Sequence, residues 1–479
     1  MFFTTALSLV FLSNFVLGTQ YLKSLKTISK NNIPSAGSSC TIYKWFDPNT
    51  SSKEGKKLLK NCSSCHKAYY KEWTGDKHSM SQTNPFFLAI YKQFREDHPK
   101  ENGNCVLCHN PEAALDDNFD VDLRLARSKK TSGISCDFCH KIESVDQNPL
   151  KEGAIGLGVL RVCEGLKDIR FGPIKDPIQP SKYEELRYNS LYKTSLYCAK
   201  CHDGKSGNTQ IYSTFTEWAE SPGAKKGVQC QSCHMKPRNT VIASRRRSND
   251  MNSIVDNPEV KHKLRPYHQI HSHSFLTEDP HILRKEYVDL NVRAGLAPAQ
   301  KSGTKHLIIT VTVSNNNFGH SFPTGSPMRN ALIVLEVKDK EGKDLKLVKG
   351  LKLPAYAGEL EGKAGKLYAK VLAETTGEYA GTHGESGIKF RKLVKELGIP
   401  ALDWWNIYIA SDTRIKASES DVSTYEFAVG AGLAPAQITA KLIWRNTWPG
   451  LAKIKGFKLE EDLLIKKKIQ FNPNKPMEL

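Results

Sequence analysis

The residues with the clearest chemical role in this chain occur in five copies of one motif. Each copy has two cysteines separated by two residues, with a histidine directly after the second cysteine. The copies run from Cys62 to His66, Cys105 to His109, Cys136 to His140, Cys198 to His202 and Cys230 to His234, and they contain ten of the twelve cysteines. C-x-x-C-H is the attachment motif of c-type haem. Its thiols bond covalently to the porphyrin, and its histidine binds the iron as a neutral imidazole.

Two other kinds of site use a C-x-x-C pair, namely half of a zinc site and a redox-active dithiol. Neither needs a histidine after the second cysteine in every copy. Because all five copies have one, we predict five covalently bound haem c groups and their iron. The predicted attachment residues are Cys62, Cys65, Cys105, Cys108, Cys136, Cys139, Cys198, Cys201, Cys230 and Cys233. The predicted proximal iron ligands are His66, His109, His140, His202 and His234.

A second histidine can fill the other axial position of each iron, and ten histidines lie outside the motifs. His78 follows the first motif in a polar stretch, and we favour it as a distal ligand over a surface histidine. For His98, both roles, distal ligand and surface histidine, stay open. His268, His271 and His273 lie within six residues of one another, so we expect one or two of them to serve. His320 completes the set of candidate distal ligands.

The N-terminal part of the chain indicates export. Residues 1–20 are apolar and uncharged, which predicts a signal peptide that ends near Gly18, with an uncleaved anchor as the alternative. Residues 21–60 form a polar lead-in segment that contains Cys40. A disulfide between Cys40 and Cys163 and two free thiols both stay open. Because c-type haem is attached outside the cytoplasmic membrane, we predict a location on the periplasmic or cell-surface side.

The chain is strongly basic, with 69 lysines and arginines against 50 aspartates and glutamates and a formal charge of +19. The propionates of five haems lower this charge by about five units in the ferric state and about ten in the ferrous state, so the protein stays basic. This favours acidic redox partners or other cytochromes, and association with membrane electron-transfer complexes, over nucleic acid.

The hydrophobic pattern predicts an α+β protein with two main domains. Residues 61–290 contain the motifs and predict a mainly helical, loop-rich pentahaem domain, with one clear amphipathic helix after Asn84 and Pro85. Residues 300–475 predict an antiparallel β-sandwich-like domain, because apolar residues alternate along several of its segments. One such set is Leu307, Ile309, Val311 and Val313.

His320 lies between two of the predicted strands, in the segment NNNFGHSFPTGSPMRN. Gly319, Pro323 and Gly325 predict a tight turn there. A second interpretation is that His320 leaves the sandwich to bind a haem iron of the preceding domain. Both interpretations stay open, and we favour ligation.

Several stretches resemble exported multihaem cytochromes c. They are Tyr70, Trp73 and His78 after the first motif, GISCDFCHKI, TFTEWAESP with GVQCQSCHM, and GHSFPTG with Asp412, Thr413 and Arg414. The group that they resemble, over residues 60–450, is cytochrome c-554 and the hydroxylamine-oxidoreductase-like proteins. The resemblance implies closely stacked haems, mostly with two histidine ligands each, and electron transfer in nitrogen, sulfur or metal respiration. No motif of this chain ends in lysine, unlike the active-haem motif of the pentahaem nitrite reductases.

Three functions follow from these observations. In an electron carrier, every iron has two histidine ligands, and this is the function that we favour. In an oxidoreductase, one haem has an open position at which a small nitrogen or sulfur species reacts, and no catalytic residue is identified for it. In a structural conductor, chains would assemble end to end with haems at the joints, although no sequence feature favours this function.

Overall fold

The computed structural model describes Cys62 and residues 66–103, 105–116, 122–124, 133–145, 160–162, 168–177, 184–206, 209–240, 268–275, 286–297, 305–317, 319–375, 399–402, 407–429 and 435–472. The predicted signal peptide, the lead-in segment, Cys65 and Cys163 lie outside these residues. The chain divides into two compact units, one with residues up to Asn208 and Gln229–Glu278, and one with Thr209–Val228 and residues from Asp279 onward.

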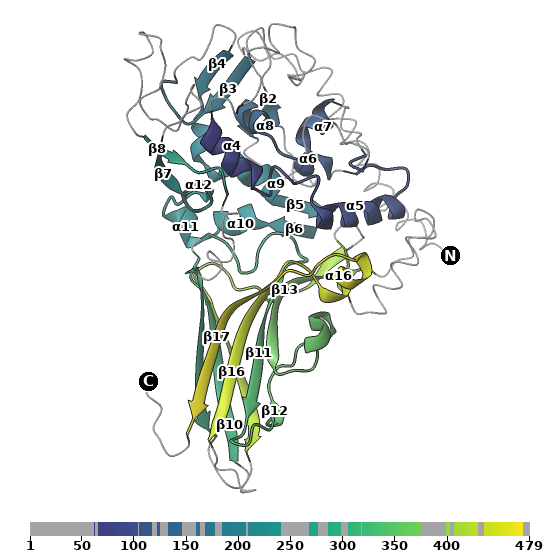
Figure 1. The fold of residues 1–479 in the computed structure, drawn as a ribbon, viewed down its shortest axis with the longest axis vertical. Coiled ribbons are helices and arrows are strands. Elements are labelled where there is room, and N and C mark those ends of the chain that lie inside the picture. Colours follow the sequence, from purple (N-terminus) through teal and green to yellow (C-terminus); the bar gives the residue numbers. More distant parts are fainter. Residues whose placement is uncertain are drawn as a thin grey trace, which may run out of the picture. The chain divides into compact units, whose positions relative to one another are not determined.

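The first unit consists of short helices and two-stranded sheets (Figure 1). Its helices are α4 (Lys67–Thr74), α5 (Pro85–Asp97), α6 (Val106–His109), α7 (Pro111–Asp116), α8 (Cys136–Lys141), α9 (Ala199–His202) and α12 (Cys230–His234), with the tighter turns η1 (Ser190–Lys193) and η2 (Ser195–Cys198). Its strands are β1 (Ile142–Val145), β2 (Leu160–Val162), β3 (Asp168–Gly172), β4 (Glu184–Tyr188), β5 (Asp203–Ser206), β7 (Pro237–Thr240) and β8 (His268–His271).

The expected helical character of this unit is only partly confirmed. Among its described helices, α5 has 13 residues and the others have eight or fewer. The sequence accounts for α5, because the side chain of Asn84 accepts hydrogen bonds from the amides of Phe86 and Phe87, and Pro85 fits the first turn. The other helices are short because four of them are little more than the turn formed by one C-x-x-C-H motif.

The second unit contains two antiparallel sheets, as the alternating pattern predicted. The four-stranded sheet has the order β12-β15-β10-β9 and the five-stranded sheet the order β14-β13-β11-β16-β17. The strands are β9 (Val288–Leu296), β10 (Lys305–Asn315), β11 (Asn330–Lys338), β12 (Leu347–Lys349), β13 (Gly365–Glu374), β14 (Ile407–Asp412), β15 (Ser420–Val429), β16 (Ala436–Arg445) and β17 (Glu461–Phe471), and the unit also contains η3 (Ala355–Leu360) and α16 (Pro449–Lys455).

The core of this unit lies between the two sheets. Leu307, Ile309, Val311 and Val313 of β10 all have zero exposure, which is the expected result of a period of two along a strand. They belong to one cluster with alternate residues of β11 and β16. The predicted antiparallel β-sandwich-like architecture is therefore confirmed.

A short segment from between the fourth and fifth motifs belongs to this second unit. It contains β6 (Thr209–Ser213), α10 (Thr214–Ala219) and α11 (Pro222–Lys225). The ammonium group of Lys370 in β13 donates to the carbonyls of Gln210 and Ile211, at 3.1 and 3.0 Å. Ile211 is fully buried. This division differs from the single boundary near residue 300 that the sequence predicted, because the partners of the segment come from distant strands.

None of the described helices is both long enough and apolar enough to cross a membrane.

Candidate haem centre

The described C-x-x-C-H motifs share one local geometry, a short helical turn. The amide of His109 donates to the carbonyl of Cys105 at 3.0 Å, and the amide of His66 donates to the carbonyl of Cys62 at 2.7 Å. Such a turn places the two cysteines on one side of the helix, with the histidine directly after them. The described cysteines form no disulfide. The donor set that c-type haem requires is therefore present at these turns.

The orientation of several imidazole rings is fixed by a hydrogen bond from Nδ1. His109 donates from Nδ1 to the carbonyl of Ser81, and His140 donates to the carbonyl of Phe171, both at 2.8 Å. A carbonyl can only accept, so the proton must be on Nδ1. The lone pair is then on Nε2, which is the nitrogen that can bind a metal.

Burial keeps two of these rings in the neutral form. It lowers the pKa of His109 to about 4 and also lowers the pKa of His140 below its usual range. Both rings are therefore neutral at pH 7, as an iron ligand must be.

Two predicted distal ligands lie opposite two motif histidines. The ring centres of His78 and His202 are 6.1 Å apart, and those of His140 and His273 are 6.3 Å apart. Two imidazoles that share one metal through bonds of about 2 Å have ring centres roughly 6 Å apart. The structure thus brings His78 to the fourth motif and His273 to the third, at separations that fit paired axial ligands.

Phe275 lies between these two pairs of histidines. Its ring centre is 4.5 Å from that of His78 and 6.2 Å from that of His273. Its φ angle of 42° lies in the left-handed region, which is uncommon for a bulky residue. Strained backbone persists only where its surroundings hold it, and the ring of Phe275 lies beside both of these histidines.

Side-chain contacts connect the motifs with one another. The thiols of Cys62 and Cys136 are hydrogen-bonded, which lowers the pKa of Cys62 below its usual range. Similar thiol contacts join Cys108 to Cys201 and Cys198 to Cys230. The contacts join the first motif to the third, the second to the fourth and the fourth to the fifth.

Two tyrosines are packed beside the third motif. The hydroxyl groups of Tyr192 and Tyr197 both donate to the carbonyl of Cys139 at 2.7 Å. Burial raises the pKa of both hydroxyls above the usual range, so they remain protonated donors. In the structure these tyrosines support the backbone of the motif.

The structure places the remaining distal candidates as follows. The ring centre of His98, at the end of α5, lies 5.0 Å from that of Phe94. His271 donates from Nδ1 to the carbonyl of Met235, directly after the fifth motif, at 2.7 Å. His268 is the first residue of β8, and its side chain lies outside the described part of the chain.

His320 belongs to the second unit. Its Nδ1 donates to the carbonyl of Ser321 at 3.0 Å, and its Nε2 lies 3.3 Å from the side-chain Nδ2 of Asn317. The tight-turn interpretation accounts for these contacts, and the ligand role stays a prediction.

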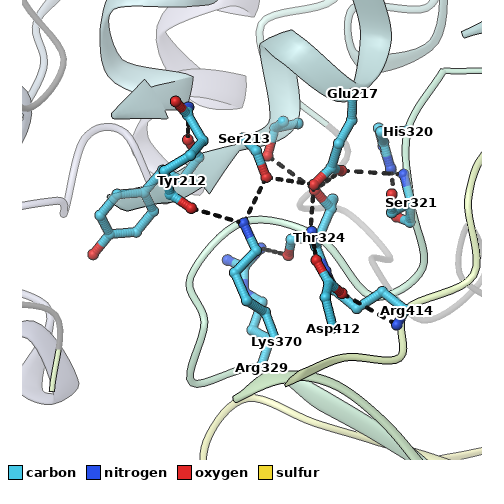
Figure 2. Close-up of polar contacts among 12 residues, drawn as sticks. Tyr212, Ser213, Glu217, His320, Ser321, Thr324, Arg329, Lys370, Asp412 and Arg414 are labelled. Atoms are coloured by element: carbon cyan, nitrogen blue, oxygen red, sulfur yellow. Dashed lines mark hydrogen bonds and ion pairs between the residues drawn. The ribbon is translucent and has the colours of Figure 1, made fainter. Parts of the chain in front are cut away.

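Near His320 lies a polar cluster that sequence reasoning did not find (Figure 2). Its centre is Glu217 of α10, and we call it the Glu217 cluster. Arg414 and Ser213 donate to one carboxylate oxygen of Glu217, both at 2.6 Å. Thr324 and the amide of Ser321 donate to the other oxygen, at 2.7 and 3.1 Å.

Electrostatics keep Glu217 charged in this buried position. Burial opposes its ionisation, but Arg414 and the hydroxyl donors hold the pKa of the carboxyl below its ordinary value of 4.5. Arg414 also binds Asp412 through two bonds, at 2.8 and 2.7 Å. Three stretches quoted for the family resemblance, TFTEWAESP, GHSFPTG and Asp412-Thr413-Arg414, therefore meet in one cluster. Because these stretches are far apart in the sequence, nothing in the sequence indicated that they are in contact.

The donor set suits haem c better than an isolated metal ion. In the described part of the chain, no group of three or more cysteine, histidine or acidic side chains could hold a metal ion. Instead, the cysteines occur in helical turns, and two motif histidines each have a second histidine about 6 Å away between ring centres. Haem c supplies an iron that changes reversibly between the ferric and ferrous states, while the residues described above fix its ligands and surroundings.

The comparison with protein families agrees with this geometry. Residues 61–141 and 175–235 match the model of a family described as cytochrome c554 and c-prime. This part of the chain is a multihaem cytochrome c of the c554 group. For this part of the chain, the family implies covalently bound haem c and supports haem-based electron transfer. Multihaem cytochromes of this type are typically exported.

The cytochrome is also similar to solved structures. One is the penta-heme cytochrome c552 from Thermochromatium tepidum, with a TM-score of 0.56, 18% sequence identity and coverage of 86% of this chain and 97% of that one. This likeness supports the fold. A second, the structural genomics target SoR45, has a TM-score of 0.17 and 8% identity over 40% of this chain and 93% of that one, and supports no argument. No curated protein matches the cytochrome.

Proposed function

We propose that the cytochrome is an exported electron carrier with five haems, mostly bound by two histidines each, in a respiratory chain. The observation that supports this best is the pairing of His78 with His202 and of His140 with His273, at ring separations of 6.1 and 6.3 Å. Iron with two histidine ligands has no position for a substrate, so it exchanges electrons without binding one.

The contacts among the motifs support rapid transfer between the haems. Thiol contacts link the first motif to the third and the fourth motif to both the second and the fifth. A chain of ring contacts through His273, Phe275 and His78 links the third motif to the fourth. Every motif thus has another motif beside it, and this closeness is what electron transfer over several haems requires.

The roles of the residues follow from this proposal. In each motif the two cysteines attach a haem and the histidine binds its iron. His78 is the distal ligand of the fourth haem, and His273 is that of the third. The distal ligands of the other three haems come from the remaining candidates, His98, His268, His271 and His320.

The charge of the chain supports acidic partners. With a formal charge of +19, it attracts acidic redox proteins, which would include other cytochromes and membrane electron-transfer complexes. We place the cytochrome on the periplasmic or cell-surface side of the cytoplasmic membrane, where these partners and c-type haem occur together.

The test is electron paramagnetic resonance of the ferric cytochrome, followed by carbon monoxide addition after reduction. We expect only low-spin signals and no carbon monoxide shift. His78→Ala and His273→Ala should each convert about one haem in five to a form that binds carbon monoxide. His306→Ala is the control, because this histidine lies in β10 of the sandwich and pairs with Glu426. A carbon monoxide shift in the unmodified cytochrome would favour the alternative, an oxidoreductase that acts on a small nitrogen or sulfur species.

A further inference from the structure

The hydrogen bond of His78 differs in kind from those of the other histidines described above. His109, His140 and His271 donate from Nδ1 to neutral backbone carbonyls. His78 donates from Nδ1 to the carboxylate of Asp76, and the Nδ1–Oδ1 distance is 2.6 Å. The side chain of Asp76 is 2% exposed, so the carboxylate lies inside the unit.

The local backbone holds the two side chains in this arrangement. Oδ1 of Asp76 also accepts a hydrogen bond from the amide of His78 at 2.7 Å, which is the geometry of a turn closed by an aspartate side chain. The hydroxyl of Ser79 donates to the carbonyl of Asp76 at 2.8 Å. The carbonyl of His78 accepts from the amide of Ile134 at 2.8 Å. The carboxylate is therefore fixed against the ring.

We propose that Asp76 is a positioning residue that lowers the reduction potential of one haem, the haem whose iron His78 binds. This inference rests on the ligand role that the proposed function gives to His78. Asp76 holds the proton on Nδ1 and so presents Nε2 to the iron.

The physical reason is the charge of the acceptor. A carboxylate draws the Nδ1 proton more strongly than a carbonyl does, which makes the ring a more basic ligand. A more basic ligand stabilises ferric iron relative to ferrous iron, and a buried negative charge acts in the same direction because water screens it little. The one-electron reduction of this iron is therefore less favourable than for an iron whose histidines donate to carbonyls. Asp76 thus gives the chain of haems one site of lower potential.

The experiment is a redox titration of the loaded cytochrome. Optical spectra and electron paramagnetic resonance monitor each haem component during the titration. Asp76→Asn keeps an oxygen that can accept both hydrogen bonds but removes the charge. We expect one of the haem components to titrate at a higher potential and its low-spin signal to move, while the other four keep theirs. Asp76→Glu restores the charge and should return the component toward its original potential.

A control separates this effect from the general loss of an acidic charge in the same unit. Asp122 pairs with Arg124 and Arg95. Asp122→Asn should leave the component that responds to Asp76→Asn unchanged. An equal shift of that component in both variants would overturn the proposal.

Failure of the inference and failure of the proposed function give different results. If His78→Ala opens no iron to carbon monoxide, the ligand role of His78 is wrong and the inference loses its basis. If His78→Ala opens one iron but Asp76→Asn changes no potential, the inference alone is overturned. If Asp76→Asn does not yield loaded protein, Asp76→Ser and Asp76→Glu replace it. We then expect the serine variant to have the higher potential, and equal potentials would contradict the proposal.

Discussion

The turn that carries His78 is packed so closely that one glycine beside it has no space for a side chain. A Cβ atom on Gly133 would overlap the carbonyl oxygen of His78 and would lie 2.8 Å from that of Ser79. Both are backbone atoms, which cannot move without the turn. Gly133 directly precedes the segment that leads into the third motif. The close contact therefore couples the position of His78 to that motif.

Gly133→Ala should displace the His78 turn and destabilise the first unit by about 1–3 kcal/mol, because overpacking forces the backbone to shift. It should also broaden the low-spin signal of the haem that His78 binds. Gly172→Ala is the matched control, since a Cβ there meets nothing within 4 Å. The stabilities of both variants are measured by chemical denaturation, monitored by the haem absorption bands. Equal stabilities of the two variants would contradict the tight packing at Gly133.

Sequence reasoning reached these ligand candidates but could not pair them. A histidine in a polar stretch after the first motif indicated His78, and a cluster of three histidines indicated His273. The pairing with His202 and His140 depends on the fold, because the partners are far apart in sequence. Asp76 gave no signal of its own, since an aspartate two residues before a histidine is common in surface turns.

At the scale of secondary structure elements, one carboxylate of α10 binds several other segments of the second unit. Each oxygen of Glu217 accepts two hydrogen bonds, and the donors come from the last residue of β6, from the loop between β10 and β11 and from the segment directly after β14. Side-chain exposure of Glu217 and Arg414 is 11% and 9%. Replacing one partner of such a buried pair costs more than breaking a pair on the surface.

Glu217→Gln should destabilise the second unit by about 2 kcal/mol, because the amide leaves the charge of Arg414 less well compensated. Arg414 keeps its bonds to Asp412, which limits the loss. Glu220→Gln is the control, since Glu220 is an exposed residue that directly follows α10. Denaturant unfolding followed by circular dichroism gives the difference.

Comparing the wild type with Glu217→Gln also gives the pH dependence of the stability that Glu217 contributes. The folded-state pKa of Glu217 is held below 4.5, so its stabilising effect is complete above that value and is lost as the pH falls through the folded-state pKa. The difference in stability between the wild type and Glu217→Gln should therefore be constant near pH 7 and shrink in acid. A difference that grows in acid would contradict this account.

The strands of the second unit could be predicted because their signal is local. The alternation through Leu307, Ile309, Val311 and Val313 marks β10, and a period of two needs no knowledge of the partner strand. The membership of α10 and β6 could not be predicted in this way. Their contacts, such as that of Ile211 with Lys370, connect residues that are 159 positions apart. Because this segment lies between two haem motifs, we expected it to belong to the same domain as the motifs.

At the scale of the whole molecule, the excess of basic residues predicts a clear effect of salt on partner reactions. The rate of electron transfer with an acidic flavodoxin used as a probe should fall on the order of tenfold as ionic strength rises through the physiological range, because salt screens long-range attraction. A neutral small-molecule reductant is the control, and its rate should change little. A flat response with the acidic probe would show that the charge of +19 does not steer its partners.

The position of the segment Thr209–Val228 in the chain also affects the order in which contacting residues are synthesised. Ser321 and Arg414, which bind Glu217, follow it by 104 and 197 positions. At synthesis rates of about 5–20 residues per second, they leave the ribosome on the order of ten seconds after α10. The fourth and fifth motifs are both complete before these partners exist. The order of the chain therefore leaves α10 without the partners of Glu217 during this interval of synthesis.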